Sequence, residues 1–154
     1  MSQIEIKTWN KKYQTIFSEL SKDWINRYFS LEECDLKILE DPQETIIDQG
    51  GEIFFAVEDG IVLGCCALII HSETTDAELG KMCVHPSAQG KGIGYKLGES
   101  LLECARQKGI QKVYLEANTI LKPSINLYHK LGFKEVLSKQ PSYKRCNLYM
   151  EIEI

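Results

Sequence analysis

Residues 84–94 read VHPSAQGKGIG, and glycine stands at every second position of the last five. Glycine destabilises a helix start unless bare backbone is needed there. A strand pattern precedes the stretch at 77–84, and small or apolar residues recur with helical spacing after it. A strand that runs into glycines and then into a helix presents unpaired N–H groups to an anion, and the helix dipole also favours negative charge there. The stretch therefore predicts a phosphate-binding turn.

Two common phosphate-binding motifs do not fit this turn. A P-loop needs Ser or Thr after the lysine of GxxxxGK, whereas Lys91 is followed by Gly92. The dinucleotide motif GxGxxG also fails, because its last position would fall on Tyr95 or Leu97. A nucleotide-binding α/β domain is therefore disfavoured.

Hydrophobic patterns along the rest of the chain alternate between strands and helices. Strands are predicted at 4–9, 51–57, 61–70, 77–84, 112–117, 133–137 and 148–154, and helices at 13–28 (one or two joined), 41–48, 92–108 and 123–131. This order predicts an α+β or α/β three-layer architecture with a largely antiparallel sheet. No repeat or linker divides the 154 residues, so one domain over 1–154 is predicted.

Two motifs together resemble the GNAT superfamily of acetyl-CoA-dependent N-acetyltransferases. The first is Gln89-x-x-Gly92-x-Gly94 after a strand, and the second is LYHKLGFKEV at 127–136, a helix-borne tyrosine before a Gly-Phe turn. The resemblance covers about residues 76–137. It implies the acyl-CoA N-acyltransferase fold, a mixed and mostly antiparallel sheet of about seven strands with helices on both faces.

The resemblance also implies that acetyl-CoA is the acyl donor and cosubstrate, with its pyrophosphate wrapped by backbone amides of the glycine turn. Many relatives carry an asparagine seven residues before the tyrosine, but this position is Leu121. Either Asn118 takes over its contact with the pantetheine arm, or the contact is missing. The expected cofactor-binding residues are Met82, Cys83, Val84, Gln89, Gly90, Lys91, Gly92, Ile93, Gly94, Tyr95, Asn118 and Ser124.

Acetyl transfer needs a base for the amine and an acid for the leaving thiolate. By position in the second motif, Tyr128 is expected to be the acid; the alternative is core packing of an aromatic residue. Glu78 is expected to be the base; the alternative is that it is a surface carboxylate without a catalytic role. Glu116, or a base acting through a water molecule, is the next candidate for the base. Strand alternation puts Glu78 on one face with Gly80, Met82 and Val84, and Gly80 is compatible with a bulge.

Composition limits the partners. The chain has 18 basic and 22 acidic residues, so its net charge of −4 argues against nucleic-acid binding. No apolar run is long enough for a membrane span and no signal-peptide core is present, which predicts a cytoplasmic protein without membrane contact. The six cysteines have no metal-ligand spacing, so they are interpreted as reduced thiols, with no metal expected.

The sequence thus predicts an N-acetyltransferase acting on a primary amine of a small molecule, peptide or protein. A non-catalytic acyl-CoA-binding sensor is the alternative. Aromatic and acidic residues in the first helical region could bind a cationic amine through cation–π contacts and charge pairing. Alternatively, the aromatic residues belong to the core and the acidic residues form a solvated face. These residues are Trp24, Tyr28, Phe29, Glu32, Glu33 and Asp35. The acyl-chain preference and the oligomeric state stay open, a homodimer included.

Overall fold

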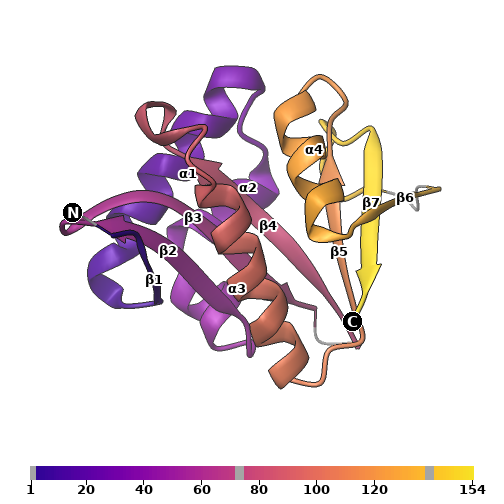
Figure 1. The fold of residues 1–154 in the computed structure, drawn as a ribbon, viewed down its shortest axis with the longest axis horizontal. Coiled ribbons are helices and arrows are strands. Elements are labelled where there is room, and N and C mark those ends of the chain that lie inside the picture. Colours follow the sequence, from indigo (N-terminus) through magenta and orange to yellow (C-terminus); the bar gives the residue numbers. More distant parts are fainter. Residues whose placement is uncertain (1–2, 72–74, 138–140) are drawn as a thin grey trace.

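A seven-stranded sheet organises the computed structural model, which describes residues 3–71, 75–137 and 141–154 (Figure 1). The strands are β1 (Glu5–Thr8), β2 (Glu52–Glu58), β3 (Ile61–Ile70), β4 (Asp76–Val84), β5 (Lys112–Ala117), β6 (Lys134–Val136) and β7 (Leu148–Glu153). Their order is β1-β2-β3-β4-β5-β7-β6. Among the strands of these described residues, only β4 and β5 pair in parallel, so the predicted mixed and mostly antiparallel sheet is confirmed.

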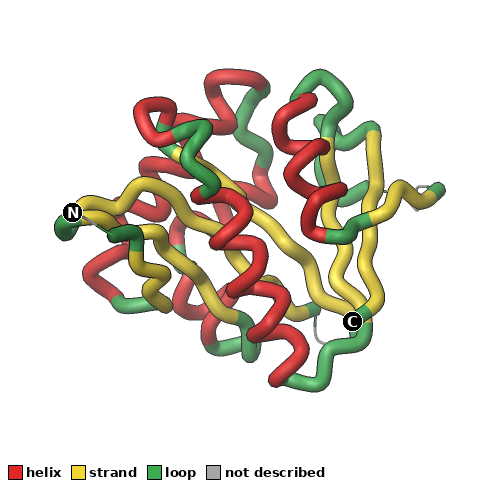
Figure 2. Tube along the Cα trace, viewed as in Figure 1, coloured by secondary structure: helices red, strands yellow, loops and turns green. Residues whose placement is uncertain are grey.

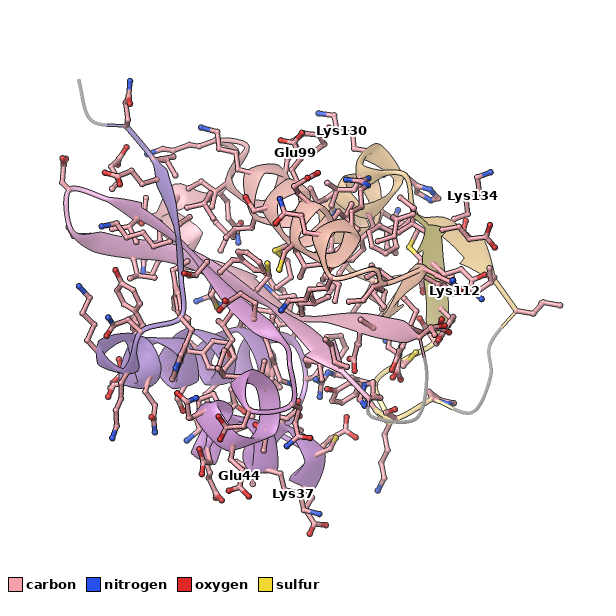
Figure 3. All side chains as sticks on the ribbon, turned by 90° about the horizontal axis from the view of Figure 1, so that it is seen from below. Lys37, Glu44, Glu99, Lys112, Lys130 and Lys134 are labelled. Atoms are coloured by element: carbon pink, nitrogen blue, oxygen red, sulfur yellow. The ribbon has the colours of Figure 1, made fainter. Side chains whose placement is uncertain are left out.

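Helices cover both faces of this sheet. They are α1 (Gln14–Tyr28), α2 (Glu33–Glu40), α3 (Ile93–Gln107) and α4 (Lys122–Leu131). Helices α3 and α4 lie on one face and α1 and α2 on the other (Figure 1). Labelled charged side chains extend beyond both helical layers, with Glu99 and Lys130 on one side and Lys37 and Glu44 on the other (Figure 3). The sheet is therefore the middle of three layers.

The N-terminal helices differ from the sequence prediction in one respect. The pattern at 13–28 becomes a 3-10 turn (Lys11–Tyr13) followed by α1, but α2 is a separate helix that the pattern did not reveal. Helix α2 buries only Asp35 and Leu39, too few positions for a periodic signal. The short helix predicted at 41–48 is a π-helical turn (Gln43–Ile47) with Pro42 as its N-cap, and the Asp41 side chain before it accepts a hydrogen bond from the Glu44 N–H at 3.1 Å.

A β-bulge interrupts the pairing of β4 with β3. Cys65 pairs with Cys83 and Ala67 with Gly80, so two residues of β4, Lys81 and Met82, face a single residue of β3. Lys81 adopts a left-handed backbone conformation with φ +52°. The bulge that Gly80 suggested is therefore present just after it.

The bulge inverts the side-chain alternation of β4. Met82 and Val84 pack into the apolar cluster beneath α3. Gly80 faces the opposite side, because a Cβ there would lie 2.9 Å from Ile69, which packs beneath α1, and 3.4 Å from the carboxylate of Glu78. The expectation that Glu78 shares a face with Met82 and Val84 was wrong, since the extra residue reverses the period of two.

Strands β4 and β5 are paired at one end only. Their parallel register joins Asp76–Glu78 to Lys112–Tyr114 and goes no further. Beyond this point the two strands diverge (Figure 1), and the loops that follow them reach the same end of the molecule (Figure 2). The sheet is thus open where β4 carries its bulge. None of the helices in the described ranges has the length and apolar character that crossing a membrane demands.

Candidate active site

A groove runs along the start of α3. The loop before the helix is held by His85, whose Nδ1 accepts a hydrogen bond from the Ser87 N–H at 3.1 Å. Gly90 and Gly92 have positive φ angles of +83° and +75°, and a Cβ at either position would meet no atom within 4 Å. Gly92 is the N-cap of α3 and provides no side-chain cap. The N–H groups of the first helical turn are therefore available to an anion.

Gly94 is required for a different reason, which is the close packing of α3 on α4. A Cβ at this position would lie 2.8 Å from Cδ2 of Leu127 in α4, and one at Gly98 would lie 2.4 Å from Cδ1 of Leu131. These two glycines let α3 and α4 approach closely. Of the three glycines in the turn, two supply left-handed backbone and the third supplies helix packing.

The structure brings most of the predicted cofactor-binding residues to this groove. It is lined by Met82, Val84, Gln89, Gly90, Gly92, Ile93, Gly94, Tyr95 and Ser124, together with Trp24, Leu121 and Leu127. Lys91 is exposed and does not line the groove. The Gln89 side chain bends back, with Nε2 donating to the Val84 carbonyl at 3.4 Å.

A pocket adjoins the groove where β4 and β5 separate. Its wall includes Glu78, Gly80, Lys81, Met82 and Cys83 of β4, Glu116 and Ala117 at the end of β5, Asn118 after β5, Ser124 and Tyr128 of α4, Trp24 and Phe29, and residues of the 143–146 loop. Four residues line both hollows, namely Trp24, Met82, Leu121 and Ser124. The groove therefore leads into the pocket.

Asn118 lines this pocket with its amide already engaged. Its Nδ2 donates to the Arg145 carbonyl at 2.8 Å, and its Oδ1 accepts from the Ile120 N–H at 3.0 Å. Both bonds brace the loops beside the pocket. A pantetheine contact through Asn118 stays a prediction, and it would have to use the remaining hydrogen-bonding capacity of the amide.

Tyr128 lies on α4 at the junction of the core and the pocket. Its side chain is buried and packs edge-to-face on Phe133 with ring centroids 6.1 Å apart. Among the described residues no hydrogen bond to its hydroxyl is found. Burial raises the pKa of Tyr128, with smaller contributions from Cys83 and Cys66, so the phenol is a neutral O–H donor.

The two candidate bases differ in what they bind. Glu78 is 4% exposed, and its Oε1 lies 3.1 Å from Nε2 of His71. Glu116 accepts the backbone N–H groups of Ser142 at 2.7 Å and Tyr143 at 3.2 Å through one oxygen. Glu116 thus holds the 142–143 loop in place, whereas Glu78 contacts one half-exposed side chain.

A buried charge cluster forms the side of the pocket, and the sequence did not predict it. Lys81 Nζ lies 2.5 Å from Asp35 Oδ1, and Arg145 donates to both oxygens of Asp35 at 2.7 and 2.8 Å. Arg145 also donates to Glu32 at 3.1 Å. Burial alone would raise the pKa of Asp35, but the hydrogen bonds and charges of Arg145 and Lys81 lower it to about 2.

This cluster corrects the expectation about acidic residues near α2. Asp35 and Glu32 form neither a solvated face nor a free site for a cationic amine, because Lys81 and Arg145 already neutralise them. The ring of Tyr143 covers the same two cations, 4.8 Å from Lys81 Nζ and 4.4 Å from the Arg145 guanidinium carbon. No local motif marks the cluster, since Asp35 and Arg145 are far apart in sequence.

Comparison with known proteins identifies the family. The model of the acetyltransferase (GNAT) family matches residues 10–133. The chain belongs to this GNAT family. The uncharacterized N-acetyltransferase YjgM of Escherichia coli (strain K12) is 37% identical over 94 residues, which cover 59% of this chain and 56% of that protein. The chain spans about half the length of the curated relatives that it matches first.

Solved GNAT structures share the fold over nearly the whole chain. An acetyltransferase of the GNAT family from Staphylococcus aureus Mu50 superposes with a TM-score of 0.88 at 20% identity, covering 98% of this chain and 99% of that one. The putative acetyltransferase yncA from Salmonella typhimurium was solved with its cofactor acetyl-CoA. It gives a TM-score of 0.76 at 21% identity, covering 98% and 94%. The GNAT fold expected from the two motifs is therefore confirmed.

Proposed function

We propose that this chain transfers the acetyl group of acetyl-CoA to a primary amine. The observation that carries the proposal is the continuity of the two hollows. A groove rich in free N–H groups at the start of α3 leads into a pocket that contains both a buried carboxylate and a buried phenol.

The groove suits the donor by its chemistry. Gly90 and Gly92 leave the backbone bare at a helix N-terminus, as the pyrophosphate of coenzyme A requires. Beyond Glu78, β4 has no β5 residue paired with it, so the backbone of 82–84 can bind the pantetheine arm as an added strand. The same backbone would donate to the oxyanion of the tetrahedral intermediate.

The pocket suits the chemistry of transfer. In each turnover an ammonium nitrogen loses two protons as its bond to the acetyl carbon forms and the carbon–sulfur bond breaks. Glu78 accepts the first of these protons, which leaves a neutral nucleophile. Tyr128 donates its proton to the departing thiolate and is reprotonated by the second. One proton per turnover passes to solvent, so charge and protons balance.

The pocket walls define the acceptor less narrowly than the groove defines the acetyl donor. Trp24 and Phe29 supply apolar surface, and the charges of Lys81 and Arg145 are balanced by Asp35 and Glu32. The cluster therefore gives the acceptor side no uncompensated positive charge with which to select an anion. We infer that the acceptor is recognised by its amine and its shape, which includes small-molecule amines and peptide N-termini.

The test measures thiol release from acetyl-CoA with a panel of amines at saturating donor. Tyr128→Phe and Glu78→Gln are expected to lower kcat by about a hundredfold while acetyl-CoA binding by calorimetry is retained. Tyr13→Phe and Glu99→Gln, both outside the groove and pocket, are matched controls expected to keep wild-type rates. Tight acetyl-CoA binding with no acetylation of any amine would instead support a non-catalytic sensor. No acetyl-CoA binding at all would overturn the proposal.

A further inference from the structure

We propose that His71, just after β3, holds the Glu78 carboxylate in its orientation toward the pocket. This inference deepens the proposed function, because it concerns the same carboxylate. His71 is a positioning residue in this scheme, since it acts on the substrate only through Glu78.

The first observation is the geometry of the pair. Glu78 is 5% exposed in its side chain, whereas the His71 side chain is 50% exposed. The atoms His71 Nε2 and Glu78 Oε1 lie 3.1 Å apart. A buried carboxylate without a donor favours its neutral form, and a neutral carboxyl group cannot take a proton from an ammonium. The His71 bond gives the buried Glu78 a hydrogen-bond partner and links it to a side chain that reaches solvent.

The second observation is that the His71 ring is itself held in place. It stacks on Tyr114 of β5 with centroids 6.1 Å apart and an interplanar angle of 25°. Tyr114 in turn stacks on Tyr149 of β7 at 5.3 Å and 10°. Tyr114 is also the residue of β5 that pairs with Glu78. The stack on β5 and β7 therefore fixes the ring beside the Glu78 carboxylate of β4.

The charged surroundings make this bond specific. The titratable and charged groups that the described elements bring around the pair are Asp76 and Lys81 of β4, Tyr114 and Glu116 of β5, Tyr149 and Glu151 of β7, Tyr143 and Arg145 of the loop before β7, and Asp35 of α2. Lys81 and Arg145 form ion pairs with Asp35, so they do not take the place of His71 as partners of Glu78. The hydrogen bond with Glu78 raises the pKa of His71, although burial opposes this, and Glu116 adds to the increase.

The pair is tested by measuring kcat and KM separately and by a variant that keeps a hydrogen-bond donor. His71→Phe keeps an aromatic ring against Tyr114 and removes the donor. His71→Gln keeps a neutral donor. His129→Phe is the control, because His129 forms an exposed pair with Glu135 at 3.7 Å. Circular dichroism and acetyl-CoA binding establish that each variant is folded.

Steady-state rates with a saturating amine are measured for each variant. The expected result is a fall of about tenfold in kcat in His71→Phe with the KM for acetyl-CoA unchanged, a smaller fall in His71→Gln and none in His129→Phe. A fall in His71→Phe no larger than in His129→Phe would overturn the proposal.

The same experiment separates this inference from the proposed function. If Glu78→Gln lowers kcat but His71→Phe does not, the base role holds and the positioning role of His71 fails. If Glu78→Gln keeps its rate, the proposed base role fails independently of His71.

Discussion

Lys81 Nζ lies 2.5 Å from Asp35 Oδ1, and this bond joins the bulge of β4 to helix α2. Lys81 is the bulged residue with a left-handed backbone, and its side chain is 3% exposed. The ion pair therefore ties the strained point of the strand to a helix on the α1 face. The bulge and the buried charges are one construction, because the left-handed residue is also the one that reaches Asp35.

Asp35→Asn is expected to destabilise the fold strongly. The substitution leaves the buried Lys81 without a compensating carboxylate and leaves Arg145 with Glu32 alone, a change that costs about 3 kcal/mol or more. Urea unfolding measures the loss in free energy. Asp23→Asn on the exposed face of α1 is the control and should stay within about 0.5 kcal/mol of wild type. Equal stability of the two variants would show that the cluster contributes nothing.

The same carboxylate predicts how stability depends on pH. The pKa of Asp35 is lowered to about 2 in the folded chain, below its ordinary value near 3.8. A lowered pKa contributes stability that is present above the ordinary value and is lost as pH falls toward the folded value. The stability gap between wild type and Asp35→Asn should therefore shrink between about pH 4 and pH 2. A gap that stays constant over this interval would contradict the assigned ionisation.

The two glutamates of the pocket should respond differently to the same change. Glu116→Gln keeps an oxygen that can accept the Ser142 and Tyr143 N–H groups, so the loop stays in place and kcat should fall by less than about threefold. Glu78→Gln removes the proposed base and should lower kcat by about a hundredfold. Steady-state rates at saturating substrates compare them. The reverse order would make Glu116 the base.

Glycine substitutions should separate cofactor binding from catalysis. Gly92→Ala places a side chain at φ +75° and should raise the KM for acetyl-CoA by about tenfold. Gly98→Ala lies outside the groove but presses on Leu131, so it should lower kcat with little change in that KM. Gly109→Ala carries the same left-handed strain at φ +77° away from the site. It controls for stability and should leave both constants unchanged.

The local parts of the fold were predictable because they depend on near neighbours in sequence. Alternation and helical spacing revealed all seven strands and three of the four α-helices found in the described part of the chain. The glycine turn and the helix after it could be predicted from VHPSAQGKGIG. Two motifs were sufficient to indicate the family. Helix α2 escaped because it is short and buries little.

The electrostatic framework of the pocket could not be predicted, because it joins distant segments. Asp35 meets Lys81 across 46 positions and Arg145 across 110, and no spacing rule relates them. The bulge had only Gly80 as a local signal, and the extra residue reversed the face assigned to Met82 and Val84. The contact between His71 and Glu78 also depends on where β3 ends and β4 begins, which alternation does not specify.

Gly94 is part of the groove wall and of the contact with α4 at once. Its missing methyl group sets the spacing between the helix that receives the cofactor and the helix that carries Tyr128. A larger residue at position 94 would be tolerated only if a smaller side chain replaced Leu127. The two positions should therefore change together among descendants of this chain, even though the chemistry of transfer uses neither side chain.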